Sequence, residues 1–171
     1  MNVIKKIKNK AVFLDRDGVI NKHTGYILDY KNFHFLKGVY QAIKYANKKK
    51  YLVIIITNQS AVGRSLITEK KLLEIHSKMK NQLKKHDAYI DDIFYSPYYS
   101  YSKYKKYRLH KECRKPEIGL FVKAIKKWNI DINSSIFVGD RITDKMAASK
   151  IKLKFYYKKK TSFYYQIKKI I

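Results

Sequence analysis

Residues 11–21 have the sequence AVFLDRDGVIN, in which four apolar residues run directly into Asp15, Arg16, Asp17 and Gly18. An apolar run of this length, with branched and aromatic side chains, predicts a buried β-strand. The strand ends at two carboxylates, and Gly18 lets the backbone turn sharply after them. Two carboxylates this close ionise together only beside a cation, and otherwise they share a proton. If a cation is present, the oxygen ligands favour Mg²⁺.

Strands and helices are predicted to alternate along the rest of the chain. Apolar runs predict strands, and apolar residues at helical spacing predict helices. The expected strands are residues 51–56, 90–95, 135–138 and 153–157, and the expected helices are about 38–49, 69–86 and 116–128, with a short helix opening at Asp144. Thr68 is a candidate N-cap, Pro116 suits a first helical turn, and His76 is expected to pack on an apolar stripe.

This alternation is typical of an α/β fold with a doubly wound, mostly parallel sheet. Ligands bind such sheets beyond the carboxyl ends of the strands. Asp15, Thr57 and Asp140 each lie at the end of a predicted strand, so the fold would bring them into one crevice. We expect one domain over residues 1–171, with a core at about 11–157. Residues 158–171 are expected to form a tail that either docks as a helix or frays.

The chain is strongly basic, with a formal net charge of +26. Lysine provides 34 of the 39 basic residues, and Lys, Ile, Tyr and Asn together fill 81 of the 171 positions. A bias that acts on the whole composition explains this charge better than a surface selected for phosphate contacts. We therefore expect no specific nucleic-acid partner. A basic nucleic-acid-associated phosphatase or binding protein is the alternative from another class.

Other compositional features bear on location. No apolar run reaches the roughly 18 residues of a membrane span, and residues 1–10 lack the apolar region of a secretion signal. The single cysteine, Cys113, excludes an internal disulfide framework and fits a reducing compartment. We therefore expect a cytoplasmic monomer that acts on a small molecule and has no membrane partner.

The polar residues at the strand ends match the needs of phosphomonoester hydrolysis. Asp15 can attack phosphorus and form an aspartyl-phosphate. Asp17 can protonate the leaving oxygen and then activate the water that hydrolyses the intermediate. Thr57 offers a hydroxyl and a backbone N–H to a phosphoryl oxygen, and Lys115 a positive charge to the transition state. Asp140 would complete a Mg²⁺ site with Asp15 and Asp17.

Asp144 is expected to hold Lys115. Each aspartate alone is also explained as a strand end or a helix cap, but a single catalytic cleft explains all of them together. A decayed, non-catalytic scaffold is a further alternative. It is disfavoured because every catalytic position is retained in a chain of otherwise biased composition.

These motifs resemble those of the haloacid dehalogenase (HAD) superfamily of phosphatases. Its first motif resembles residues 15–18, its second Thr57, its third Lys115, and its fourth Gly139 and Asp140 with Asp144. The segments at 15–21, 57–64 and 113–116 resemble more narrowly the D-glycero-D-manno-heptose 1,7-bisphosphate 7-phosphatases, which serve lipopolysaccharide precursor biosynthesis.

The resemblance implies a Rossmann-like core without a large cap domain, and Mg²⁺-dependent removal of the 7-phosphate from a heptose bisphosphate. It also implies a set of substrate-binding residues, namely His23, Thr24, Gly25, Tyr26, Asn58, Gln59, Ser60, Arg114 and Arg141. Histidinol-phosphate phosphatases are the nearest alternative. That branch usually carries Asp where Ser60 stands, so Ser60 and Arg64 favour the heptose branch.

One part of the heptose-phosphatase pattern is missing. Those enzymes typically carry a Cys/His zinc site in the loop before Arg-Lys-Pro, and only Cys113 matches it here. Ser96, Tyr98 and Lys111 stand where the other ligands are expected. A structural zinc site needs four ligands, and His110 with Cys113 supplies two. We therefore expect no structural zinc, and we expect tyrosines to hold the loop.

Overall fold

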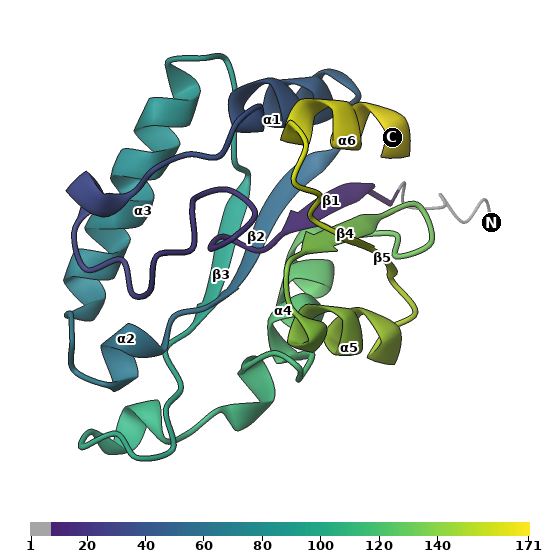
Figure 1. The fold of residues 1–171 in the computed structure, drawn as a ribbon. Coiled ribbons are helices and arrows are strands. Elements are labelled where there is room, and N and C mark those ends of the chain that lie inside the picture. The colour runs from purple at the N-terminus through teal and green to yellow at the C-terminus, as the bar shows by residue number, and fades with distance from the viewer. Residues whose placement is uncertain (1–7) are drawn as a thin grey trace.

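The computed structural model describes residues 8–171 and is built on a parallel sheet (Figure 1). Within this range the sheet has five strands in the order β3-β2-β1-β4-β5, and every paired neighbour runs parallel. The strands are β1 (Ala11–Leu14), β2 (Leu52–Asn58), β3 (Asp92–Ser96), β4 (Ile136–Gly139) and β5 (Lys154–Tyr157). The predicted doubly wound α/β fold is therefore confirmed.

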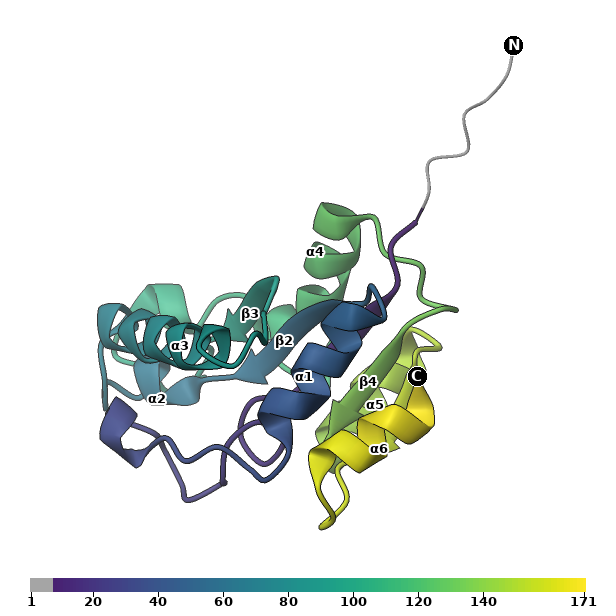
Figure 2. The ribbon, with the colours of Figure 1, turned by 90° about the horizontal axis from the view of Figure 1, so that it is seen from above.

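Helices join the strands and cover both faces of the sheet (Figure 2). The α-helices are α1 (Val39–Lys48), α2 (Ser60–Gly63), α3 (Glu69–Lys84), α4 (Gly119–Trp128), α5 (Ile142–Lys150) and α6 (Phe163–Ile170). Short 3-10 turns occur at Tyr30–Asn32, Lys105–Tyr107 and Lys111–Cys113. No helix in the described range is long and apolar enough to cross a membrane.

Side-chain alternation along the strands separates two hydrophobic cores. Val12 and Leu14 of β1 belong to the core under α1, α3 and α6, whereas Phe13 belongs to the core under α4 and α5. Successive residues of a strand point to opposite faces, so a strand buried on both faces is apolar throughout. This explains why the strands appear in the sequence as continuous apolar runs.

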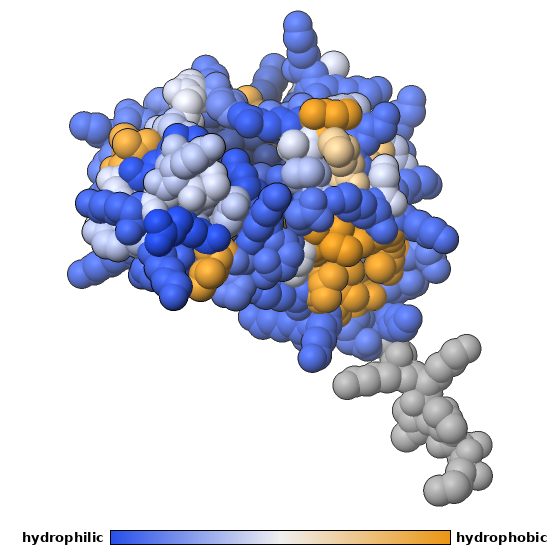
Figure 3. Space-filling model, turned by 90° about the horizontal axis from the view of Figure 1, so that it is seen from below, coloured by the Kyte–Doolittle hydropathy of each residue, from blue (hydrophilic) through white to orange (hydrophobic). Residues whose placement is uncertain are grey.

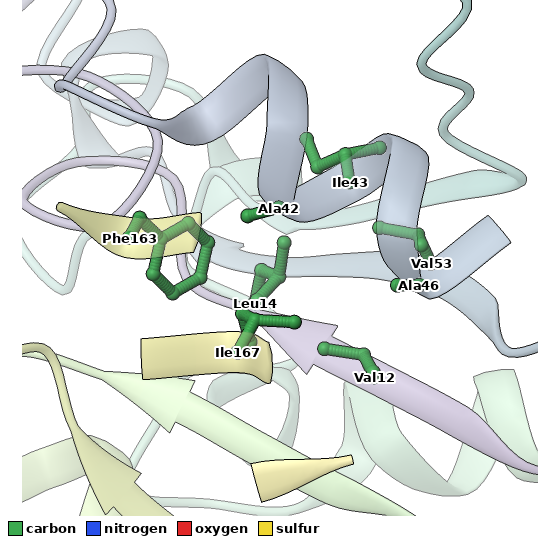
Figure 4. Close-up of a pocket in the computed structure, with 8 residues that line it drawn as sticks. All are labelled: Val12, Leu14, Ala42, Ile43, Ala46, Val53, Phe163 and Ile167. Carbon is green, nitrogen blue, oxygen red and sulfur yellow. The ribbon is translucent and has the colours of Figure 1, made fainter. Parts of the chain in front are cut away.

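The C-terminal tail docks as a helix, one of the two outcomes expected for it. Phe163 and Ile167 of α6 are buried against Val12, Leu14 and the inner face of α1 (Figure 4). Gln166 ties α6 to the end of β5, because its amide nitrogen donates to the backbone oxygen of Tyr157 at 2.7 Å. The tail therefore completes one of the two cores.

Two local predictions were wrong or incomplete. Pro116 does not begin a helix, because residues 114–117 form a turn closed by the Glu117 N–H on the Arg114 carbonyl at 2.8 Å, and α4 starts only at Gly119. The short helix α2 was not predicted, since four residues give no periodicity. The N-cap at Thr68 is confirmed by its hydroxyl, which accepts the Lys71 N–H at 3.1 Å.

A tyrosine attaches the long loop between β3 and α4 to the rest of the fold. The hydroxyl of Tyr107 in the loop donates to one carboxylate oxygen of Glu69 at 3.2 Å, and the hydroxyl of Tyr95 in β3 donates to the other at 2.8 Å. Tyr107 is buried against Val62 and Leu72. The loop that leads to Lys115 is thus attached to the first turn of α3.

Hydrophilic residues cover most of the molecular face shown in Figure 3, with one larger and several smaller apolar groups among them. The most exposed apolar residues of α4 and α5 are Val122, Ile142 and Met146.

Candidate active site

A pocket of about 430 Å³ opens at the carboxyl ends of the strands. It collects most of the residues that the sequence predicted for the site, namely Asp15, Asp17, His23, Gly25, Tyr26, Thr57, Asn58, Gln59, Ser60, Arg114, Lys115, Arg141 and Asp144. Thr24 is exposed and does not line the pocket, and Asp140 lies just behind it, next to Asp15 and Asp144. The sheet thus unites segments that are more than a hundred residues apart.

Gly18 lets the turn after β1 pack closely against Asp140, which follows β4. Its φ of +88° is a conformation that side chains disfavour. A Cβ atom built there would lie 2.1 Å from a carboxylate oxygen of Asp140. Only glycine therefore accommodates both the turn after β1 and the approach of Asp140.

Three carboxylates and one ammonium group form the floor of the site. Asp15, Asp140 and Asp144 each offer an oxygen within 4.8 Å of the others. The ammonium nitrogen of Lys115 lies 2.9 Å from Asp15 and 2.6 Å from Asp144, and it donates to the backbone oxygen of Ile56 at 2.8 Å. These three contacts match the three N–H groups of the lysine. The predicted contact between Asp144 and Lys115 is confirmed.

The floor carries more negative than positive charge. Burial raises the pKa of Asp15 from 3.8 to about 6, against the opposing effect of Lys115 and with a further rise from Asp144. Burial, followed by the charge of Asp144, also raises the pKa of Asp140. Burial alone would lower the pKa of Lys115, but Asp15 and Asp144 outweigh it and hold the pKa above its usual value. Three carboxylates against one ammonium leave two negative charges, which a divalent cation would neutralise.

The donor set fits such a cation. Asp140 Oδ1 is buried, and no hydrogen-bond partner for it occurs among residues 8–171. Asp144 is already engaged, because its second oxygen accepts the backbone N–H groups of Asp140 and Arg141 at 3.2 and 3.1 Å. Asp15 and Asp140 are therefore the side chains best placed to hold Mg²⁺, whose preferred ligands are oxygens.

Asp17 lies outside this cluster and is held by four donor groups. Both of its oxygens accept hydrogen bonds from Arg16, at 2.9 to 3.1 Å, and Asn21 and Gln59 each donate at 2.9 Å. Burial alone would raise the pKa of Asp17, but the Arg16 charge and these hydrogen bonds outweigh it and lower the pKa. The carboxylate therefore rests ionised beside the pocket. Its role as a metal ligand stays a prediction.

The residues after β2 hold other parts of the site. Gln59 donates to the Thr57 hydroxyl at 2.9 Å as well as to Asp17. Asn58 is engaged at both ends of its amide, since it donates to the backbone oxygen of Lys115 and accepts its backbone N–H, each at 3.0 Å. Both bonds fix the backbone of Lys115 in position. The expected contact of Asn58 with substrate stays a prediction.

Three arginines lie at or near the pocket, where Arg114 and Arg141 belong to its lining and Arg64 is close to Arg114. Burial, together with the neighbouring charges of Arg64 and Arg141, lowers the pKa of Arg114. Arg141 contacts the ring of His23. The Arg64 guanidinium lies 3.9 Å from the centre of the Tyr99 ring, a geometry that orients its planar face. These cationic groups suit a second anionic group of a ligand.

Four residues that line the pocket were not among the predicted catalytic, metal or substrate-binding residues, namely Arg16, Ile27, Pro116 and Thr143. Arg16 is the most consequential, because it contacts Asp17. Its place in a candidate site segment indicated that its guanidinium would matter, but gave no sign of which group it contacts. His76 is packed as predicted, and it also contacts Arg16.

Comparison with known sequences agrees with this site. A family model described as polynucleotide kinase 3 phosphatase matches residues 10–165. The chain is 38% identical over 146 residues to a D-glycero-beta-D-manno-heptose-1,7-bisphosphate 7-phosphatase from Haemophilus influenzae, covering 85% of this chain and 79% of that one. It is 35% identical over 141 residues to a D-glycero-alpha-D-manno-heptose-1,7-bisphosphate 7-phosphatase from Campylobacter jejuni, covering 82% and 77%.

Comparison with solved structures supports the fold. A D,D-heptose 1,7-bisphosphate phosphatase from B. bronchiseptica, crystallised with magnesium and phosphate, superposes with a TM-score of 0.80. The match covers 94% of this chain and 97% of that chain, at 23% sequence identity. The two chains therefore share one fold over most of their lengths, and no large cap domain occurs among residues 8–171 of this chain.

Proposed function

The chain belongs to the heptose-1,7-bisphosphate 7-phosphatase family of HAD phosphatases, and from that premise we propose that it removes the 7-phosphate of D-glycero-D-manno-heptose 1,7-bisphosphate with the help of Mg²⁺. The observation that carries the proposal is the floor of the pocket, where Lys115 bridges Asp15 and Asp144 beside Asp140. This arrangement supplies a nucleophile, a fixed positive charge and oxygen ligands within one cluster. The product would serve lipopolysaccharide precursor biosynthesis.

Asp15 is the proposed nucleophile. It ends the central strand and lines the pocket, and its carboxylate is held by Lys115. Attack on phosphorus forms the Asp15 acyl-phosphate and breaks the bond to the sugar oxygen. Lys115 directs its three N–H groups to Asp15, Asp144 and the backbone oxygen of Ile56. It therefore keeps a fixed positive charge where the phosphoryl oxygens gain charge.

Asp17 is the proposed acid and base. Asp17 first takes up a proton from the phosphate monoester or from solvent, and as an acid it passes this proton to the departing sugar oxygen. As a base it then takes a proton from the water that cleaves the acyl-phosphate, which leaves it protonated for the next turnover. The Asp17 carboxylate lines the pocket and is ionised at rest, which is the form that accepts a proton. Thr57 and its backbone N–H are proposed to bind a phosphoryl oxygen.

Asp15 and Asp140 would hold the metal ion, with Asp17 as a further proposed ligand. Bound Mg²⁺ neutralises the charge of the transferring phosphoryl group.

The arginines at or near the pocket are proposed to bind the second phosphate of the substrate. Arg114 and Arg141 offer planar guanidinium groups that match phosphate geometry. The remaining proposed substrate contacts are His23, Thr24, Gly25, Tyr26, Asn58, Gln59 and Ser60. A pocket with a catalytic floor and these cationic groups suits a bisphosphate better than a monophosphate.

A phosphate-release screen tests the proposal. It compares both anomers of the heptose bisphosphate, since relatives named for each anomer match the chain. Histidinol phosphate and a 3′-phosphorylated oligonucleotide serve as alternatives, the latter because of the family description and the net charge of +26. We expect the highest kcat/KM for a heptose bisphosphate. A higher value for histidinol phosphate or the oligonucleotide would contradict the assignment.

Substitution of the nucleophile gives a second test. Asp15→Asn should abolish turnover while the circular dichroism spectrum stays unchanged, because the amide cannot form the acyl-phosphate. Residual activity within about tenfold of wild type, equivalent to about 1.4 kcal/mol in the barrier, would contradict the role of Asp15.

We also propose that the chain acts as a single-domain monomer in the cytoplasm, on a small molecule and without a specific nucleic-acid partner. Light scattering during gel filtration tests the oligomeric state. Oligonucleotide binding that persists at physiological ionic strength would contradict the last point, because non-specific binding to lysines weakens steeply with salt.

A further inference from the structure

Arg16 is among the largest fully buried side chains in the described range, and it lies next to the proposed catalytic acid. Its Nε and Nη2 donate to the Asp17 carboxylate at 2.9 to 3.1 Å. Its remaining nitrogen, Nη1, lies 3.1 Å from Nε2 of His76 on α3. A buried guanidinium has a high cost unless its N–H groups find acceptors. His76 is the acceptor for the side of Arg16 that Asp17 does not reach.

The chemistry of this contact fixes the form of the histidine. Arginine stays protonated and only donates, so Nε2 of His76 must accept. The ring is then neutral and carries its proton on Nδ1. The environment agrees, because burial and the adjacent Arg16 charge lower the pKa of His76 to about 3. The edge-to-face contact with the Tyr95 ring, at 5.8 Å between centroids, holds the imidazole plane.

We propose that Arg16 and His76 are positioning residues that hold the Asp17 carboxylate in the orientation it needs to protonate the leaving oxygen. This inference rests on the proposed function, in which Asp17 is the general acid. Arg16 engages both oxygens of Asp17, so rotation of the guanidinium would rotate the carboxylate with it. His76 prevents that rotation from the far side, and it is anchored in α3, sixty residues further along the chain.

The other donors to Asp17 do not replace this restraint. Asn21 donates only to Oδ1 and Gln59 only to Oδ2, each through one hydrogen bond. These two bonds add to the restraint on the carboxylate, whereas Arg16 contacts both oxygens through one planar and fully buried group. The Asp17–Arg16–His76 chain is therefore the connection that ties the plane of the acid to α3.

A leaving-group comparison separates positioning from general damage. The sugar oxygen of the heptose bisphosphate is a poor leaving group and needs protonation, whereas the phenolate of 4-nitrophenyl phosphate leaves with little help. His76→Phe removes the acceptor but keeps a ring against Tyr95. His76→Gln restores an acceptor oxygen near the position of Nε2. Met79→Ala alters a buried residue one turn further along α3 without touching Arg16, and serves as the matched control.

We expect His76→Phe to lower kcat/KM for the heptose bisphosphate by about 10–100-fold, the range seen when a supporting hydrogen bond is lost. The fall with 4-nitrophenyl phosphate should be below about threefold, because general-acid help contributes little to that reaction. His76→Gln should return to within about threefold of wild type on both substrates. Met79→Ala should show no preference between the substrates.

The reference variant is Asp17→Asn, which should show the same substrate dependence in stronger form. If it shows none, the general-acid assignment fails, and this inference fails with it. If Asp17→Asn shows the dependence but His76→Phe loses equally on both substrates, or loses nothing, this inference alone is overturned. The same follows if His76→Gln is no better than His76→Phe.

A measurement on the wild-type protein tests the contact without any variant. Nitrogen-15 NMR of the histidine rings should find His76 neutral, with its proton on Nδ1, from about pH 5 to pH 8, since its pKa lies near 3. A His76 ring that is protonated in this range, or that carries its proton on Nε2, would overturn the inference even if His76→Phe failed to fold.

Discussion

Removal of the metal should make the stability of this protein depend on the ionisation of Asp15. Without a cation, burial raises the pKa of Asp15 from 3.8 to about 6. The folded state therefore binds this proton more tightly than the unfolded state does. The resulting stabilisation is present while the group is protonated and is lost as the pH rises through about 6. From about pH 5 to pH 7.5, linkage gives a loss of about 1.4 kcal/mol.

His76 has the opposite effect over the same range. Its pKa is lowered from 6.5 to about 3. Between these two pH values His76 is protonated in the unfolded chain and neutral in the folded protein. Stability is then lost as the pH falls below 6.5, by about 2 kcal/mol at pH 5. The two effects oppose each other and leave a net gain of only about 0.6 kcal/mol from pH 5 to pH 7.5, so the pH profile of the wild type alone does not isolate Asp15. The difference between wild type and Asp15→Asn does, because His76 is common to both.

The assay is thermal or urea unfolding in EDTA, followed by circular dichroism. Between about pH 5 and pH 7.5, the wild type should lose about 1.4 kcal/mol relative to Asp15→Asn, which is about 3–6 °C in Tm for a chain of this size. Saturating Mg²⁺ should reduce this loss, because the cation neutralises the cluster at Asp15 and Asp140. A difference that stays flat within about 0.3 kcal/mol in EDTA would refute the claim that burial outweighs Lys115 at Asp15.

Three further predictions concern the rest of the molecule. Phe163→Ala should lower the free energy of unfolding, measured with urea, by about 3–5 kcal/mol. Tyr165→Ala, on the exposed face of α6, should change it by less than about 0.5 kcal/mol. Equal effects of the two substitutions would mean that α6 is not docked. Tyr107→Phe removes one hydrogen bond to Glu69, and should speed proteolysis of the loop before Lys115 without a large loss of overall stability; unchanged cleavage would show that the bond does not hold the loop. Elemental analysis should find no stoichiometric zinc, and about one zinc per chain would contradict this.

The sequence by itself determined the strands, their parallel arrangement and the acidic floor of the site. Apolar runs such as residues 11–14 are long enough to identify a strand buried on both faces, and a polar residue directly after the run must lie at its carboxyl end. Parallel strands align these ends, so the sequence alone places Asp15, Thr57 and Asp140 together.

Apart from the predicted contact between Asp144 and Lys115, the tertiary structure decided which of these groups hold one another. Lys115 uses all of its N–H groups on three partners. Asn58 bonds to the backbone of Lys115, and Glu69 accepts a hydrogen bond from Tyr107 of the loop. None of these pairings follows a local period, since the partners lie on different elements. The sequence also left open whether residues 158–171 would dock, because the apolar stripe of a short helix does not identify its partner.

Arg16 shows the physical reason most clearly. Its place in the first motif does not indicate which groups its guanidinium contacts, and in the fold it contacts Asp17 and His76, which is sixty residues away. A buried charge takes the conformation in which all its donors find acceptors, and packing alone decides which acceptors are within reach. The spacing of residues in the sequence therefore predicted where the carboxylates lie, whereas the tertiary structure determined which side chains orient them.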